Sequence, residues 1–168
     1  MHQNKPWVVF FVALVWGVVA SAQLQVKDAW VRAVVPGQQG TGAFMTLQAS
    51  ENLTITAASS PWAAVAQIHN MAMEGNVMKM AAVDSLALQS GQALTLKPGG
   101  YHVMLMDLKE GFAKLTQLPL TISFKTANGS TQTVTLQVPV MANAPASSSR
   151  AGGMDSKDHS QHMETMKH

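Results

Sequence analysis

The residues with the clearest chemistry are histidines and methionines between positions 68 and 106, where they alternate with other side chains. Three short stretches share this pattern: His69, Met71 and Met73; Met78 and Met80; and His102, Met104 and Met106. Successive side chains of a β-strand point to opposite faces of its sheet. Each stretch, if extended, would therefore present imidazole and thioether groups on a single face.

The spacing of the first two stretches predicts a β-hairpin. The segment Glu74–Asn76 separates them, and both Glu-Gly and Gly-Asn are acceptable centres for a tight turn. A two-residue loop at Glu74-Gly75, or a four-residue loop around it, places His69 opposite Met80. A two-residue loop at Gly75-Asn76 places Met80 opposite Met71 instead. Both registers keep the methionines on the face of His69, whereas a three-residue loop would shift the alternation by one residue.

Such a cluster suits a narrow range of metal ions. Thioether sulfur is a soft, neutral ligand that favours Cu(I), and imidazole binds copper in both common oxidation states. Zinc sites prefer thiolate, imidazole and carboxylate, and no carboxylate shares the predicted face. Methionine also fills irregular cores, so packing explains any one of these residues alone. Two histidines that each lead a methionine pattern favour a metal site, with monovalent copper as its ion.

Composition excludes several other classes of protein. The 168 residues include no cysteine, which removes disulfides, thiolate metal sites and cysteine nucleophiles. Charged residues make up 12% and the net charge is +2, so no nucleic-acid partner is expected. A blue-copper electron-transfer site needs a cysteine thiolate. No Ser/His/Asp arrangement can be picked out for nucleophilic catalysis either, so the sequence predicts a metal carrier and not an enzyme.

The N-terminal residues predict export. Lys5 precedes an apolar run that ends near Ala20, and small residues follow up to Ala22. We therefore expect residues 1–22 to be a signal peptide, cleaved after Ala22, that directs the protein to the periplasm. The run is shorter than the roughly 20 residues of a membrane-spanning helix, so no membrane span is expected after cleavage. Without a cysteine to carry a lipid, the mature protein is expected to be soluble.

Residues 23–141 predict a single all-β domain. Short apolar stretches alternate with turn signals and no convincing amphipathic helix is present, a pattern typical of a sandwich or small barrel. Strands are expected at 24–33, 43–47, 52–57, 83–88, 93–96, 120–126 and 131–138. Glycines 37, 40 and 42 are expected to form a loop. The last two strands should meet across Asn128-Gly129 in a primed turn.

Residues 142–168 have the composition of a flexible tail. They begin with a Pro- and Ser-containing linker and show no apolar pattern, so we expect disorder without metal. The tail contains a second set of copper-type ligands: Met154, His159, His162, Met163, Met166 and His168. Together with nearby carboxylates these would form a second copper site able to hold Cu(II) as well as Cu(I). An ordinary polar tail is the alternative.

The spacing of four residues resembles a known motif. His69 and Met80 are separated by ten residues, Met80 and His102 by twenty-one, and His102 and Met104 by one. This pattern is similar to the metal motif of the PCuAC periplasmic copper chaperones. Further similar segments are Ala29–Ala33 with Pro36-Gly37, Val77–Met80, Leu96–Gly100 and His102–Met106. The resemblance covers about residues 24 to 140.

The resemblance implies a cupredoxin-like Greek-key β fold and a Cu(I) site made by His69, Met80, His102 and Met104. It also implies that copper is handed on for assembly of the CuA centre of cytochrome c oxidase. The expected partners are subunit II of that oxidase, a Sco-type thiol protein, or both, and the carrier itself is expected to be a monomer. A periplasmic copper buffer or tolerance protein is the alternative, because its ligands would be the same.

The remaining methionines need separate interpretation. Three lie on the ligand faces but outside the motif: Met71, Met78 and Met106. They are expected to shield the metal or to bind it transiently during transfer, with packing as the alternative. Met45 and Met73 are expected to pack, and Lys79 and Tyr101, which point to the opposite face, are expected to be structural.

Overall fold

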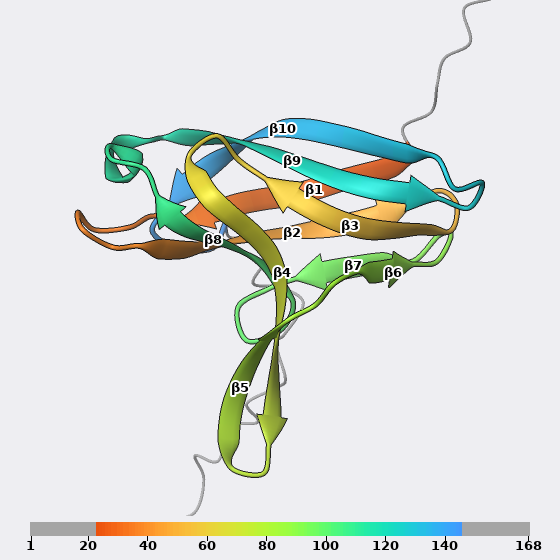
Figure 1. The fold of residues 1–168 in the computed structure, drawn as a ribbon, viewed down its shortest axis with the longest axis horizontal. Coiled ribbons are helices and arrows are strands. Elements are labelled where there is room, and N and C mark those ends of the chain that lie inside the picture. Colours follow the sequence, from red (N-terminus) through yellow and green to blue (C-terminus); the bar gives the residue numbers. More distant parts are fainter. Residues whose placement is uncertain (1–22, 146–168) are drawn as a thin grey trace, which may run out of the picture.

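The computed structural model describes residues 23–145, which form ten β-strands and one turn of 3-10 helix (Figure 1). The elements are β1 (Leu24–Arg32), β2 (Gly40–Ala49), β3 (Leu53–Ser59), β4 (Ala63–Glu74), β5 (Val77–Ala82), β6 (Leu86–Leu88), β7 (Ala93–Leu96), β8 (His102–Leu108), η1 (Phe112–Lys114), β9 (Gln117–Thr126) and β10 (Thr131–Met141). The all-β prediction is confirmed. The predicted signal peptide and all the tail ligands lie outside the described residues.

The strands are hydrogen-bonded in the order β5-β4-β8-β2-β1-β10-β9-β3-β6, and β7 pairs with β2. One short parallel contact, at Val31 with Val140 and Arg32 with Met141, joins the two halves of this order. The half that contains β3, β9 and β10 lies over the half that contains β1, β2 and β8 (Figure 1). The result is an open two-layer sandwich, from which the hairpin of β4 and β5 projects.

The core lies between the two layers and follows from strand alternation. Fully buried side chains come from both halves, among them Val31 and Leu105 from one and Leu120 and Ile122 from the other. In β8, Val103 and Leu105 belong to this core. His102, which precedes Val103, and Met104, which separates the two core residues, must then point to the outer face of the sheet.

Two glycines expected in a loop lie in β2, which begins at Gly40. Gly42 pairs with Met104 of β8, and Gly40 pairs with Met106. A Cβ atom at Gly42 would lie 2.7 Å from Cζ of Phe44, because that ring folds back over the glycine. The loop prediction was wrong here: the glycine gives room to an aromatic ring within a strand and does not serve a turn.

The turn between β9 and β10 also differs from the prediction. The N–H of Thr126 donates to the carbonyl of Ser130 and the N–H of Gly129 donates to the carbonyl of Thr126, which defines a three-residue loop. Gly129 is the residue of this loop with a positive φ, 85°, whereas a primed type I turn needs two. The side chain of Asn128 accepts from the N–H of Ser130 at 3.0 Å, which favours this local turn.

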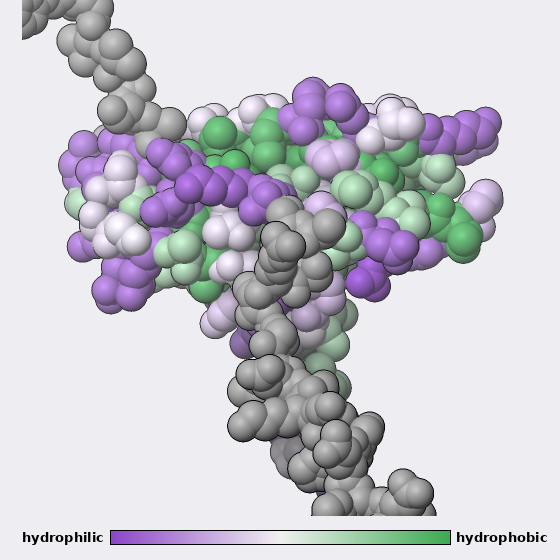
Figure 2. All heavy atoms as spheres, turned by 180° about the vertical axis from the view of Figure 1, so that it is seen from behind, coloured by the Kyte–Doolittle hydropathy of each residue, from purple (hydrophilic) through white to green (hydrophobic). Residues whose placement is uncertain are grey.

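The surface visible in Figure 2 is mixed in hydropathy. On the face shown in Figure 2, hydrophilic and apolar residues interchange over short distances. This fits a chain with few charged residues and a net charge of +2. Among the described residues, no helix has the length and apolar character needed to cross a bilayer.

The core position of β8 makes a direct prediction. Replacing the fully buried Leu105 with Ala should lower the free energy of unfolding by about 2–5 kcal/mol, because it removes apolar contacts and leaves a cavity. Val77→Ala, on the exposed hairpin, should change it by less than about 0.5 kcal/mol. Urea denaturation of both variants checks this. Equal effects would contradict the assignment of Leu105 to the core.

Candidate metal site

The two histidines of the central region lie side by side on neighbouring strands. β4 and β8 are antiparallel, and their register pairs His69 directly with His102. The ring centroids are 5.9 Å apart in an edge-on arrangement, and both side chains are buried. Their chain neighbours Ile68 and Val103 point into the core, so the two imidazoles lie on the outer face of the sheet.

The aromatic ring of Phe44 lies beside His102 and also contacts Trp30. The ring of Phe44 is 6.2 Å from that of His102 and 4.7 Å from that of Trp30. The guanidinium of Arg32 lies 5.7 Å from the centre of the Phe44 ring, in a cation–π contact. Trp30 and Phe44 are both buried. Such apolar surroundings limit the access of water to the nitrogen atoms of the histidines.

The carbonyl of Gly100 orients His102. It lies 3.0 Å from Nδ1 of His102, and since a carbonyl only accepts, this nitrogen carries the proton. In the neutral form of this ring, Nε2 carries the lone pair. The same carbonyl accepts the backbone N–H of Met71 at 3.2 Å, which ties β4 to the turn before β8. A histidine that binds a metal commonly donates its other N–H to a carbonyl in this way.

His69 is held differently. Its Nε2 lies 3.2 Å from Oε1 of Gln67, which can only accept, whereas its Nδ1 is buried with no hydrogen-bond partner among the described residues. Burial, and secondarily the neighbouring His102, lower the pKa of His69. The ring is therefore neutral, with a buried lone pair on Nδ1. An unpartnered buried nitrogen is unfavourable, and a bound metal ion would satisfy it.

The hairpin register resolves the alternatives for the methionines. Gly75 and Asn76 form a two-residue loop, and Gly75 has a φ of 63°, as expected for the first position of a type II′ turn. Met80 therefore lies opposite Met71, and the alternative that pairs it with His69 is wrong. The cross-strand pairs confirm that the methionines of β4 and β5 share the face of His69.

A cavity of about 290 Å³ opens beside His102. Met71 and Met104 line it together with His102, Phe44 and Arg32. A Cβ atom at Gly40 would lie 3.1 Å from the methyl carbon of Met104. The glycine therefore leaves room for this side chain.

The four residues of the predicted motif are thus placed unequally. His69, His102 and Met104 lie on adjacent strands, with Met104 diagonal to His69. Met80 lies one strand further out on β5, half exposed, and does not line the cavity. Met71, which the sequence assigned to shielding or transient binding, is the hairpin methionine that lines it.

The other interpretations of single residues have mixed outcomes. Met45 is almost fully buried, so its packing role is confirmed, but Met73 is 61% exposed and its predicted packing role is wrong. The reason is that the hairpin extends beyond the start of β8 and has no strand of that sheet beside its tip (Figure 1). Lys79 forms an ion pair with Glu74, and Tyr101 packs against the core.

The donor set fits a soft ion better than a hard one. Within residues 23–145, no three His, Cys, Asp or Glu side chains gather in a way that could hold a metal. Met71 and Met104, which line the cavity beside His102, are soft donors next to the paired histidines, and such a donor set suits a soft ion.

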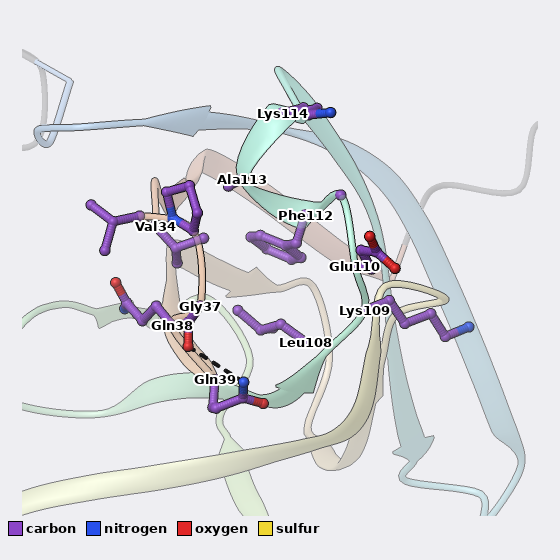
Figure 3. Close-up of a pocket in the computed structure, with 13 residues that line it drawn as sticks. Val34, Gly37, Gln38, Gln39, Leu108, Lys109, Glu110, Phe112, Ala113 and Lys114 are labelled. Carbon is purple, nitrogen blue, oxygen red and sulfur yellow. Dashed lines mark hydrogen bonds between the residues drawn. The ribbon is translucent and has the colours of Figure 1, made fainter.

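A larger cavity, of about 830 Å³, lies between the loop 34–39 and the segment 108–114 (Figure 3). Leu108 and Phe112 turn toward its middle, whereas the side chain of Lys109 turns away. Gln39 donates a long hydrogen bond to the carbonyl of Gly37 at its rim. None of the lining residues is a histidine or methionine, so this cavity offers no soft-metal site.

Comparison with known proteins decides the family. The sequence model of the LpqE-like family, a family described in terms of lipoproteins, matches residues 24–140. The chain belongs to the LpqE-like family. Lxx21020 of Leifsonia xyli subsp. xyli (strain CTCB07), which carries a lipoprotein name, is 29% identical to this LpqE-like chain over 122 residues, 72% of each protein.

Solved structures agree with the fold. The copper-bound PCuAC domain from PmoF2 is 21% identical with a TM-score of 0.57, and the match covers 74% of the LpqE-like chain and 97% of that domain. The Cu(I) form of DR1885 from Deinococcus radiodurans is 30% identical with a TM-score of 0.53, covering 74% of this chain and 83% of DR1885. The resemblance to PCuAC proteins and the cupredoxin-like fold are thereby confirmed.

The lowered pKa of His69 predicts how the stability of the metal-free protein depends on pH. Below about pH 6.5 the unfolded chain binds a proton at this residue, whereas the folded chain does so only at a lower pH. The free energy of unfolding should therefore decrease as the pH falls below that value. Denaturation of metal-free protein at about pH 7.5 and pH 5.5 measures this decrease.

The matched variant is His69→Gln, which has no titratable group at this position. It should lose less stability than the wild type over the same pH interval. If both proteins lose the same amount, the buried neutral state of His69 is not the source of the effect.

Proposed function

We propose that this LpqE-like protein is an exported copper chaperone that binds Cu(I) through His69, Met80, His102 and Met104. The observation that carries the proposal is the pair of adjacent buried imidazoles beside Met104 and the ring of Phe44, in which Nδ1 of His69 has no hydrogen-bond partner among the described residues. The copper-bound PCuAC domain from PmoF2 and the Cu(I) form of DR1885, which are similar to this chain in fold, support it.

Each ligand would contribute through a specific atom. Nε2 of His102 and Nδ1 of His69 carry the available lone pairs, and the thioether of Met104 lies along β8 from His102. Met80 would reach the ion from the hairpin, so it is the ligand whose position depends on a projecting element. All four groups are neutral, and they leave the bound ion with a single positive charge in apolar surroundings. Such a set holds Cu(I) without a cysteine and avoids the strong carboxylate ligation preferred by harder ions.

The proposed destination is the CuA centre of cytochrome c oxidase. Delivery would go to subunit II, to a Sco-type thiol protein, or to both, in the periplasm after cleavage behind Ala22. The lipoprotein names of the relatives support export. A copper buffer is the second candidate, favoured by the His- and Met-rich residues between 154 and 168, which lie outside the described residues.

Replacing His102 with Ala tests the proposed four-ligand site, which is called the core site below although it lies on the outer face of the sheet. The affinity for Cu(I) should fall by about a hundredfold or more. Loss of a group that only supports a metal ligand already lowers affinity by about 10–100-fold, and this variant removes a ligand itself. The β fold should persist because His102 lies outside the core. A Cu(I) titration against a competing chelator measures the affinity. Lys125→Ala, on β9 in the other layer, serves as the control, and an unchanged affinity in His102→Ala would remove the core-site proposal.

Truncation after Met141 tests the tail. This cut retains β10 and the hydrogen bond from the N–H of Ala33 to the carbonyl of Met141, so every described strand remains. The shortened protein should keep the Cu(I) site at His69, Met80, His102 and Met104 and lose binding of Cu(II). Titration with each ion measures both. Retained Cu(II) binding would show that the tail does not supply the second site.

A further inference from the structure

The hairpin carries more thioethers than the proposed core site uses. Its two cross-strand methionine pairs are Met71 with Met80 and, nearer the tip, Met73 with Met78. Directly opposite residues of an antiparallel pair have Cβ atoms about 4.5–5.5 Å apart. Because a methionine side chain has three rotatable bonds, the two sulfur atoms of each pair can converge on one ion.

Packing does not account for the pair at the tip. Met73 is 61% exposed and Met78 is 49% exposed, and every residue of β5 is exposed. Of the five large hydrophobic side chains exposed among the described residues, four lie on this hairpin: Met73, Val77, Met78 and Met80. Thioethers that touch no core remain free to bind a ligand from solution or from another protein.

Charge on the hairpin is confined to its other face. Glu74 and Lys79 form an ion pair that links the two strands, and both residues alternate away from the methionines. The methionine face of β4 and β5 is therefore uncharged and offers sulfur alone beyond His69. Sulfur ligands without carboxylates select soft monovalent ions over zinc, calcium or magnesium.

Met73 and Met78, the pair at the tip, also lie in line with His69 on the same face of the hairpin. Residues two apart on a strand are separated by about 6.7 Å, so the face runs from His69 to Met71 and Met80, and then to Met73 and Met78. The whole path measures about 13 Å. An ion passing along it would exchange one ligand at a time, from imidazole to thioether to exposed thioether.

We propose that Met73 and Met78 form a second binding position for a soft monovalent cation at the tip of the hairpin. Met71 and Met80 connect this position to the histidines, and the tip is where copper passes between this protein and its partner. The role in transfer rests on the proposed copper-carrier function, whereas the binding position itself does not. The ion keeps its charge and oxidation state throughout, because each step replaces one neutral ligand by another.

Ag(I), a soft monovalent probe without redox chemistry, tests the binding position in the full-length protein. The methyl signals of the methionines, labelled with ¹³C and assigned with single Met→Leu variants, report which sulfur atoms bind. Once the core site is occupied, further Ag(I) should shift the signals of Met73 and Met78. The double variant Met73→Leu/Met78→Leu should bind one ion fewer than the wild type. Met45→Leu, a buried methionine away from the hairpin, should bind as many as the wild type.

Three outcomes separate this inference from the proposed function. If the signal of Met104 shifts and those of Met73 and Met78 do not, the hairpin position is wrong and the core site stands. If His69→Ala/His102→Ala protein still shows shifts at Met73 and Met78, the hairpin position stands without the core. Equal ion counts for the double variant and Met45→Leu would also overturn the position.

The role in transfer is tested by kinetics. Copper transfer from loaded protein to a methionine-containing acceptor peptide should be about tenfold slower in Met73→Leu/Met78→Leu than in Met45→Leu, as expected when a contact is lost from the transfer transition state. Stopped-flow measurements at matched occupancy provide the rates. Equal rates would show that copper leaves by another route.

Discussion

The candidate site depends on the antiparallel pairing of β4 with β8. This register sets His69 beside His102, and the alternation of both strands sends Ile68 and Val103 into the core. The same apolar contacts that hold the sandwich together therefore keep the two imidazoles on its outer face. The carbonyl of Gly100 adds a second constraint, since it accepts both from His102 and from the backbone of β4. Ligand geometry and fold stability consequently share their main source.

The hairpin has the opposite character. Its strands pair with each other beyond the start of β8, its β5 residues are all exposed, and a single ion pair between side chains lies on its polar face. A buried pair of histidines next to a projecting row of thioethers fits the proposed carrier, which must hold an ion and also release it. Regions with few buried contacts open at the lowest free energy, so movement of this hairpin would leave the core undisturbed.

Part of this arrangement could be predicted from local sequence. Alternation placed the histidines and methionines on common faces, turn residues located most strands, and the absence of cysteine restricted the metal chemistry. The errors concerned positions whose role depends on the surrounding side chains or on exposure, which residue type alone does not show. Gly40 and Gly42 have the residue type of a loop, but both lie in β2. There Gly40 leaves room for Met104 of another strand, and Gly42 leaves room for the ring of Phe44, which folds back over it. Met73 looked like a packing residue because exposure cannot be read from residue type.

The sequence by itself determined the residue types of the donor set, their shared faces and the all-β class, because strand alternation and turn chemistry are local. Only the tertiary structure decided which of these residues meet. It set Met80 opposite Met71 and chose Met71 to line the cavity, since hairpin register depends on the turn that the whole strand pair adopts. It also placed the ring of Phe44 beside His102, through the pairing of β2 with β8, two strands far apart in the chain.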